Sequence, residues 1–135
     1  MAVQYSTGVR NGMLDAIEVA IGTGAILKIR SGAQPATCAT ADSGTVLVSY
    51  TLASDWASAA SGGSKAFSST PISTTAAAAG TAGHYRIYAS DGTTCHEQGA
   101  ITATGGGGDM TVDNTSIASG QTVNITGFSK TMGGA

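Results

Sequence analysis

The clearest alternation of apolar and polar residues lies in the second half of the chain, over residues 84–125. Tyr85, Ile87 and Ala89 alternate with polar or charged neighbours, which is the two-residue period of a half-buried strand. The turn that follows, Ser90-Asp91-Gly92-Thr93, is typical of a tight hairpin, because glycine adopts a positive φ without steric cost. This pattern predicts an antiparallel meander against which the rest of the chain packs.

The returning segment, Thr94–Thr104, predicts the second strand of this meander. Glu97 falls on the apolar face, so we expect a β-bulge near Gly99 or a strand edge. Two further alternating runs follow, around Met110/Val112 and around Val123/Ile125. The apolar face of the returning strand consists of Cys95, Gly99, Ile101 and Ala103.

The N-terminal part of the chain contains the one persuasive helix pattern. Thr7 or Asn11 could provide its N-cap, and Gly22 is expected to end it. Asp15 and Glu18 lie on the side opposite the apolar residues. The apolar stripe, at steps of three and four, is made of Val9, Met13, Leu14, Ile17, Ala20 and Ile21.

This stripe is expected to cover an open end or face of the chain's own sheet domain. The alternative is a helix that docks on another subunit. Up to Ser6 the chain is expected to be an extended arm.

Between the helix and the meander, shorter alternating runs predict strands at 25–30, 45–52 and 65–67. Trp56, the only tryptophan, is expected to be a core or corner anchor. Residues 68–80 are nearly featureless and predict a long surface connection or a weak edge strand.

About seven or eight short strands, with turn signals roughly every ten residues, favour one all-β domain. The expected fold is an antiparallel β-sandwich of jelly-roll or Greek-key type with one N-terminal amphipathic α-helix. The expected division is an arm and helix over 1–24 and the sandwich over 25–135.

Composition narrows the classes of function. Only 10% of the 135 residues are Asp, Glu, Lys or Arg, and the formal net charge is −2. No basic patch is present for phosphate contacts, so a nucleic-acid surface is not expected, and no apolar run is long enough for a membrane span. A surface of Ser, Thr, Ala and Gly suits a protein that is covered by copies of itself or by partners.

Cys38 and Cys95 are far apart in the sequence, and their state is left open. They could pair after release into an oxidising environment. In a protein made in the cytoplasm, two thiols are more often reduced and buried.

The remaining candidate chemistry is weak. Cys95, His96, Glu97 and His84 are residues of metal-ligand type, but alternation along a strand sends neighbours to opposite faces, so no metal site is expected. The Gly105–Gly108 run is interpreted as a hairpin connection rather than a phosphate cradle, because a strand pattern follows it. No nucleophile elbow is present, and no catalytic residues or cofactor are expected. The carboxylates are mostly interpreted as turn residues: Asp42, Asp55, Asp91, Asp109, Asp113 and Glu97.

A carbohydrate-binding module is the main alternative among binding proteins. Sandwiches of this size often present aromatic side chains to sugar rings. The available aromatic residues are Tyr50, Trp56, Tyr85 and Tyr88, which the core alone could absorb.

Several segments together resemble one group of proteins. They are Leu14–Gly22, Leu27–Ala36, Ala41–Thr45, Ser54–Trp56, Ala82–Ile87 and Gly105–Asn114. This whole-chain pattern resembles small structural proteins that are encoded among the virion genes of tailed bacteriophages.

The resemblance implies a structural protein of the phage particle, made in the host cytoplasm and located in the virion. Within that group a small β-sandwich fits a head decoration or cement protein on the outside of the major-capsid shell, and a tail, neck or fibre component is the nearest alternative. The implied partners are the major capsid protein and further copies of this chain, as a homodimer or homotrimer. The residues expected to make contacts are Val3, Gln4, Tyr5, Ser68, Ser69, Thr70, Pro71, Gly107 and Asp109.

Overall fold

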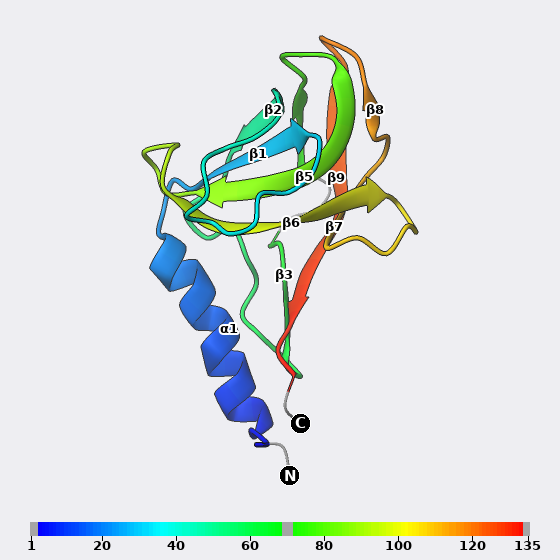
Figure 1. The fold of residues 1–135 in the computed structure, drawn as a ribbon. Coiled ribbons are helices and arrows are strands. Elements are labelled where there is room, and N and C mark those ends of the chain that lie inside the picture. The colour runs from blue at the N-terminus through cyan, green and yellow to red at the C-terminus, as the bar shows by residue number, and fades with distance from the viewer. Residues whose placement is uncertain (1–2, 69–71, 134–135) are drawn as a thin grey trace.

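A computed structural model of the chain describes residues 3–68 and 72–133. One helix, α1 (Thr7–Ile21), lies below the main body of a curled sheet. It runs beside the strand segments that extend downward from that body (Figure 1). In the described part of the chain the strands are β1 (Ile26–Ser31), β2 (Val46–Thr51), β3 (Ser64–Ala66), β4 (Ile72–Thr75), β5 (Gly80–Tyr88), β6 (Cys95–Ala103), β7 (Met110–Val112), β8 (Ser116–Ile117) and β9 (Thr122–Thr131). The expectation of a mostly β protein with one N-terminal helix is therefore confirmed.

Hydrogen bonds join these strands into one sheet. Its main order is β2-β1-β5-β6-β7-β9-β3, and β4 pairs with β9 while β8 pairs with β5. The sheet curls so that β4, which lies beside β9, approaches β2 at the other edge. The backbone N–H of Ala77, just after β4, donates to the carbonyl of Leu47 in β2 at 2.8 Å. The fold is thus a curled mixed sheet.

The expectation of a purely antiparallel sheet is wrong at one pair of strands. β6 and β7 run parallel, with Ile101 opposite Met110, whereas the other pairs are antiparallel. The glycine-rich loop makes this possible by folding back along the end of β6. A Cβ on Gly106 or Gly108 would lie 2.7 Å or 2.9 Å from the side chain of Thr102, so only glycine fits this return.

The two predicted strands of the meander are confirmed, but the bulge between them lies elsewhere than expected. Ile87 is opposite Glu97 and Tyr88 is opposite Cys95, so His96 is the extra residue. Gly99 is in regular register instead. A Cβ there would lie 2.7 Å from the ring of Tyr85, which explains the glycine by close packing.

The core lies on the concave side of the sheet. An aromatic group closes it: Phe67 stacks on Phe128 at 4.5 Å between ring centroids, and Trp56 and Tyr85 contact these rings edge-on. The expectation that Trp56 is a core anchor is confirmed, because the residue is buried. The aliphatic core residues include Leu27, Ile29, Ile87, Val112, Val123 and Ile125.

The N-cap of the helix lies before both expected caps, one residue before Thr7 and five before Asn11. Ser6 is the N-cap, and its hydroxyl accepts a hydrogen bond from the backbone N–H of Val9 at 3.2 Å. Gly22 ends the helix as expected, with a φ of 87° that favours glycine.

Candidate interaction surface

The outer face of α1 carries no charge. Between Gly8 and Ile21, every residue that is exposed is glycine, alanine, valine or methionine. The most exposed is Val19, at 81% of its full area. Contiguous exposed apolar surface of this kind is typical of a site that a partner covers. The outer face consists of Gly8, Val9, Gly12, Met13, Ala16, Val19 and Ala20.

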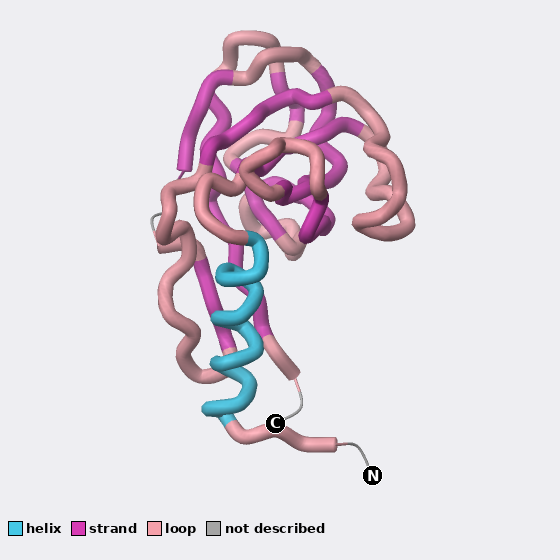
Figure 2. Tube along the Cα trace, turned by 90° about the vertical axis from the view of Figure 1, so that its left-hand side faces the viewer, coloured by secondary structure: helices cyan, strands magenta, loops and turns pink. Residues whose placement is uncertain are grey.

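The charged residues of α1 point the other way, toward the body of the protein. Figure 2 shows the helix lying along the strands at the lower end of the molecule. Leu14 and Ile21 are buried there, and Ile17 packs against the core. Asp15 and Glu18, expected on the side opposite the apolar residues, accept hydrogen bonds from the backbone of the neighbouring loop, and the Asp15 side chain is also 46% exposed.

The cause of this orientation is the ammonium group of Lys65 in β3. Its side chain is only 4% exposed, and its Nζ lies 2.8 Å from Asp15 Oδ1 and 3.0 Å from Glu18 Oε2. Burial alone would lower the pKa of Lys65, but the bonds to both carboxylates outweigh burial and raise it. The bond from Lys65 likewise lowers the pKa of Asp15. A buried charge requires such partners, so the helix is held in this rotation.

Polar contacts also hold the start of α1. The Asn11 carbonyl oxygen accepts from the backbone N–H of Gly63 at 2.8 Å, and Arg10 Nη1 donates to the carbonyl of Met132 at 3.3 Å. The beginning of the helix is thereby attached to the loop before β3 and to the end of the chain that follows β9. The expectation that the apolar stripe covers the chain's own domain therefore holds for Leu14, Ile17 and Ile21 but is wrong for Val9 and Met13.

The expected arm continues this apolar surface. Val3 and Tyr5 are exposed and directly precede the N-cap, and Gln4 between them is also exposed. Val3, Tyr5, Val9, Met13 and Val19 are the exposed large hydrophobic residues of the described ranges, and all lie within the first 19 positions. Near the other end of the helix, the surface continues into a shallow hollow lined by Glu18, Val19, Gly22, Thr23, Ser54 and Asp55.

The other expected contact residues are not gathered on this surface. Ser68 is exposed, but its hydroxyl donates to the carbonyl of Asp55 at 2.8 Å. Ser69, Thr70 and Pro71 lie outside the described residues. The loop before β7, with exposed Gly107 and Asp109, lies at the side of the sheet, far from the start of α1 (Figure 1).

Asp109 has a structural partner as well. Its carboxylate accepts a hydrogen bond from the backbone N–H of Ala100 at 2.9 Å, which fixes the loop against β6. The contacts of the arm and of this loop with other molecules remain predictions.

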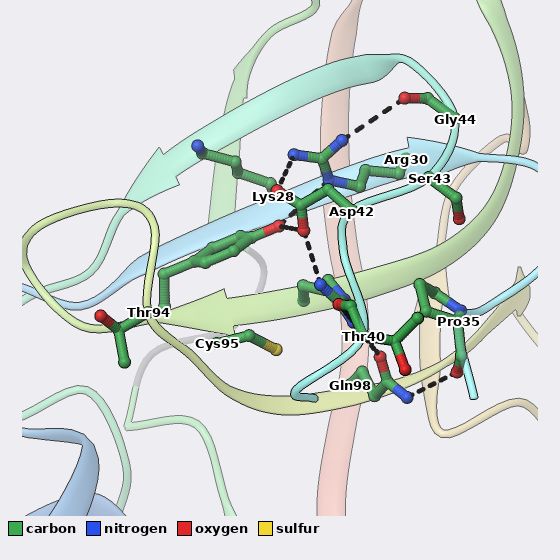
Figure 3. A network of polar contacts seen from close by, with 12 residues as sticks. Lys28, Arg30, Pro35, Thr40, Asp42, Ser43, Gly44, Thr94, Cys95 and Gln98 are labelled. Carbon is green, nitrogen blue, oxygen red and sulfur yellow. Dashed lines mark hydrogen bonds and ion pairs between the residues drawn. The ribbon is translucent and has the colours of Figure 1, made fainter. Parts of the chain in front are cut away.

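The convex face of the sheet holds a polar cluster that sequence analysis missed. Asp42, interpreted as a turn residue, accepts from Arg86 at 2.6 Å, from Tyr88 at 2.7 Å and from Arg30 at 2.9 Å (Figure 3). Both arginines are buried, and Gln98 accepts from Arg86 at 2.9 Å. These contacts hold the loop that carries Asp42 against the sheet.

The pKa of Asp42 reflects this arrangement. Burial alone would raise it, but the hydrogen bonds from Tyr88 and Arg86 and the charges of both arginines outweigh burial. The pKa of Asp42 therefore lies below its ordinary 3.8. The one signal in the sequence was that Arg30 and Arg86 alternate with core residues on their strands, but the strand pairing that brings them together could not be deduced.

A further, largely buried ion pair explains Glu97 on the apolar side of β6. The Lys130 ammonium lies 3.0 Å from Glu97, and Tyr85 donates to the same carboxylate at 3.1 Å. Burial lowers the pKa of Lys130, and the Glu97 charge opposes that shift in part. Glu97 is therefore an interior partner of Lys130 and not a sign of a strand edge.

The residues considered for other chemistry are dispersed. His84 is fully buried, with Nδ1 3.0 Å from the carbonyl of Gly32, whereas His96 is exposed at the bulge. Across residues 3–68 and 72–133, no three His, Cys, Asp or Glu side chains gather in a way that could hold a metal ion. The expectations of no metal, cofactor or catalytic residue stay predictions.

Comparisons with known proteins identify no relative: no family model, no curated protein and no solved structure matches this chain. In the ranges that the structure describes, no helix is long and apolar enough to cross a membrane. The fold and the surface define the class as a mostly β protein with one helix whose outer face is apolar.

We expect Asp42→Asn to destabilise the protein by about 2–3 kcal/mol. Removing one partner of a fully buried ion pair costs roughly 3–5 kcal/mol, and the cost here is smaller because water reaches part of this carboxylate. The folded pKa lies below the unfolded value, so the carboxylate contributes fully above that value and loses its contribution as the pH falls.

Urea unfolding from about pH 6 to about pH 2 measures this effect. The difference between wild type and variant should shrink below about pH 4. A constant difference across this range would contradict the assigned role of the Asp42 charge.

Proposed function

We propose that this chain is a structural protein of a bacteriophage particle, namely a decoration or cement protein on the outside of the major-capsid shell. The observation that carries the proposal is the uncharged outer face of α1. Charged residues on an exposed helix keep a free protein soluble. In α1, however, the carboxylates of Asp15 and Glu18 bond to the body of the protein. The resemblance noted in the sequence supplies the type of assembly.

The fold supports the same proposal. We infer that the curled sheet is a variant of the jelly-roll or Greek-key sandwich, because the segment after β4 bonds to β2 and closes the two ends of the sheet over one core. Such a body presents α1 and the end of β9 on one side, where Arg10 of the helix bonds to Met132 at the lower end of the molecule (Figure 1). That side can face the shell.

Attachment would use many modest contacts. Copies of the chain around an icosahedral lattice, each seated by its arm and by the outer face of α1, would join neighbouring capsomers. Contacts between copies about a shared two- or threefold axis repeat one patch and raise avidity without further types of contact. The major capsid protein and further copies of this chain are the proposed partners.

A tail, neck or fibre component is the second candidate. Its possible role in binding sugars on the host surface rested on four aromatic residues, but Tyr50, Trp56, Tyr85 and Tyr88 are all buried. Their rings therefore cannot stack on a sugar in this structure, and the decoration role is favoured.

Quantitative mass spectrometry of purified particles of the encoding phage tests the location. We expect hundreds of copies of this chain per particle, because a decoration protein follows the lattice of the shell. A handful or a few dozen copies would place it in the tail, neck or fibre, and absence from particles would overturn the virion proposal.

The double substitution Met13→Glu and Val19→Glu tests the outer face of α1. Both side chains are exposed, so the thermal midpoint should change little, while two charges in a covered contact should weaken binding at least about tenfold. The measurement is co-sedimentation with particles that were assembled without the chain.

The matched control adds the same charges to the sheet body, as Ala103→Glu and Ser119→Glu, at two exposed positions. This control should bind like the wild type. Unchanged binding of the helix variant, at an unchanged thermal midpoint, would exclude the helix face as the contact.

Removal of residues 1–5 tests the arm separately. Ser6 is retained because it caps α1, so the domain should stay folded. We expect lower occupancy on particles, since Val3 and Tyr5 are lost from the apolar surface. Normal occupancy of the truncated chain would show that the arm is not an anchor.

A further inference from the structure

The β-bulge in β6 determines where Cys95 points. Ile87 and Glu97 face the core side of the sheet, and without the bulge Cys95 would share their face. Because His96 is the extra residue, Cys95 is instead opposite Tyr88, whose side chain lies in the polar cluster on the convex face. A bulge can re-aim a side chain in this way.

The loop between β1 and β2 brings Cys38 to the same face. Arg86 Nη2 donates to the carbonyl of Thr37 at 2.9 Å and to that of Thr40 at 3.0 Å, so the residues on both sides of Cys38 are held. Gln98 also donates to the carbonyl of Pro35 at 2.7 Å. These bonds fix the loop over β5 and β6.

Cys38 and Cys95 therefore come to the same face of the sheet, although they are 57 positions apart in the sequence. Cys95 Sγ donates to the carbonyl of Glu97 at 3.4 Å, the nearby Cys38 raises the pKa of Cys95, and neither cysteine is in a disulfide. In Figure 3 the Cys95 sulfur points toward the loop that carries Thr40. Both residues are half-buried, so a small reagent can reach them.

We propose that Cys38 and Cys95 are a site of covalent modification, at which a low-molecular-weight disulfide such as oxidised glutathione converts the two thiols into an intramolecular disulfide. The Cys38 thiolate attacks one glutathione sulfur, which forms a mixed disulfide and releases one glutathione thiolate. The Cys95 thiolate then attacks the Cys38 sulfur and releases the second. Two cysteine thiols are oxidised, one glutathione disulfide is reduced to two thiols, and the two cysteine protons pass to the released thiolates.

The pKa of Cys95 is consistent with Cys38 as the first thiol to attack. Burial and then the interaction with Cys38 raise the pKa of Cys95 to about 11, so Cys95 stays protonated near neutral pH. Once Cys38 is part of the mixed disulfide, it no longer raises the pKa of Cys95. The nearby Arg86, which lowers the pKa of Cys95, remains and favours the second attack.

The disulfide would fasten the loop that carries Asp42. This loop covers the buried arginines of the polar cluster, and in the reduced protein only hydrogen bonds and ion pairs hold it there. A covalent link between distant parts of the chain restricts the unfolded state and so stabilises the fold. The inference does not depend on the proposed role in a phage particle.

The experiment treats the native full-length chain with oxidised glutathione near neutral pH, with a dithiol-reduced sample as reference. We expect loss of both free thiols, an intact mass lower by two hydrogens without attached glutathione, and a monomer on a non-reducing gel. The thermal midpoint should rise by about 5–10 °C on oxidation.

Three variants serve as controls. Cys38→Ser and Cys95→Ser should show no oxidation-dependent rise in the midpoint, and Cys95→Ser should stop at the mixed disulfide on Cys38. Cys38→Ser combined with Ala39→Cys keeps the number of thiols but moves one by a single position, and should form the link at least about tenfold more slowly.

Two free thiols after treatment, two attached glutathiones or a disulfide between chains would each overturn the proposal. So would equally fast cross-linking of the shifted variant, because the position of Cys38 would then have no importance.

Discussion

The ion pairs between Lys65 and the carboxylates of Asp15 and Glu18 set the rotation of α1, and the surface of the protein depends on that rotation. A nearly buried ammonium group is stable only if carboxylates face it, so both acidic residues must turn toward β3. Leu14 and Ile21 lie on the same side and are buried. Apart from the partly exposed Asp15 side chain, the exposed residues of α1 from Gly8 onward are glycine, alanine, valine and methionine. Exposed apolar surface of this kind is typical of a site that a partner covers.

The same principle operates on the convex side of the sheet. β5 has core residues on one face and the side chains of His84, Arg86 and Tyr88 on the other, and both faces are buried. The second face is covered because Asp42 neutralises part of the charge of two arginines and its loop supplies carbonyl groups to Arg86. The loop between β1 and β2, which shows no strand or helix pattern in the sequence, therefore stabilises the fold. It also brings Cys38 to the face of the sheet on which Cys95 lies.

The expectations about side-chain placement and strand direction were wrong where residues far apart in the sequence interact. Helical periodicity placed Asp15 and Glu18 opposite the apolar residues, but it cannot show that they pair with a lysine 47 or more positions later. The faces of β6 were assigned by strict alternation, and the bulge at His96 moved Cys95 to the other face. The parallel pairing of β6 and β7 was missed because strand patterns carry no direction, and short connections usually join antiparallel strands.

The sequence by itself determined the helix, its end at Gly22, the strands of the meander and the burial of Trp56, because hydrophobic periodicity and glycine conformation act over a few neighbouring residues. It also determined that the surface is poor in charge. Tertiary structure alone decided which side of the helix is covered, which arginines share Asp42 and that the two cysteines come to one face of the sheet. Those outcomes follow from the pairing of buried charges and from strand register, which exist only once distant segments are in contact.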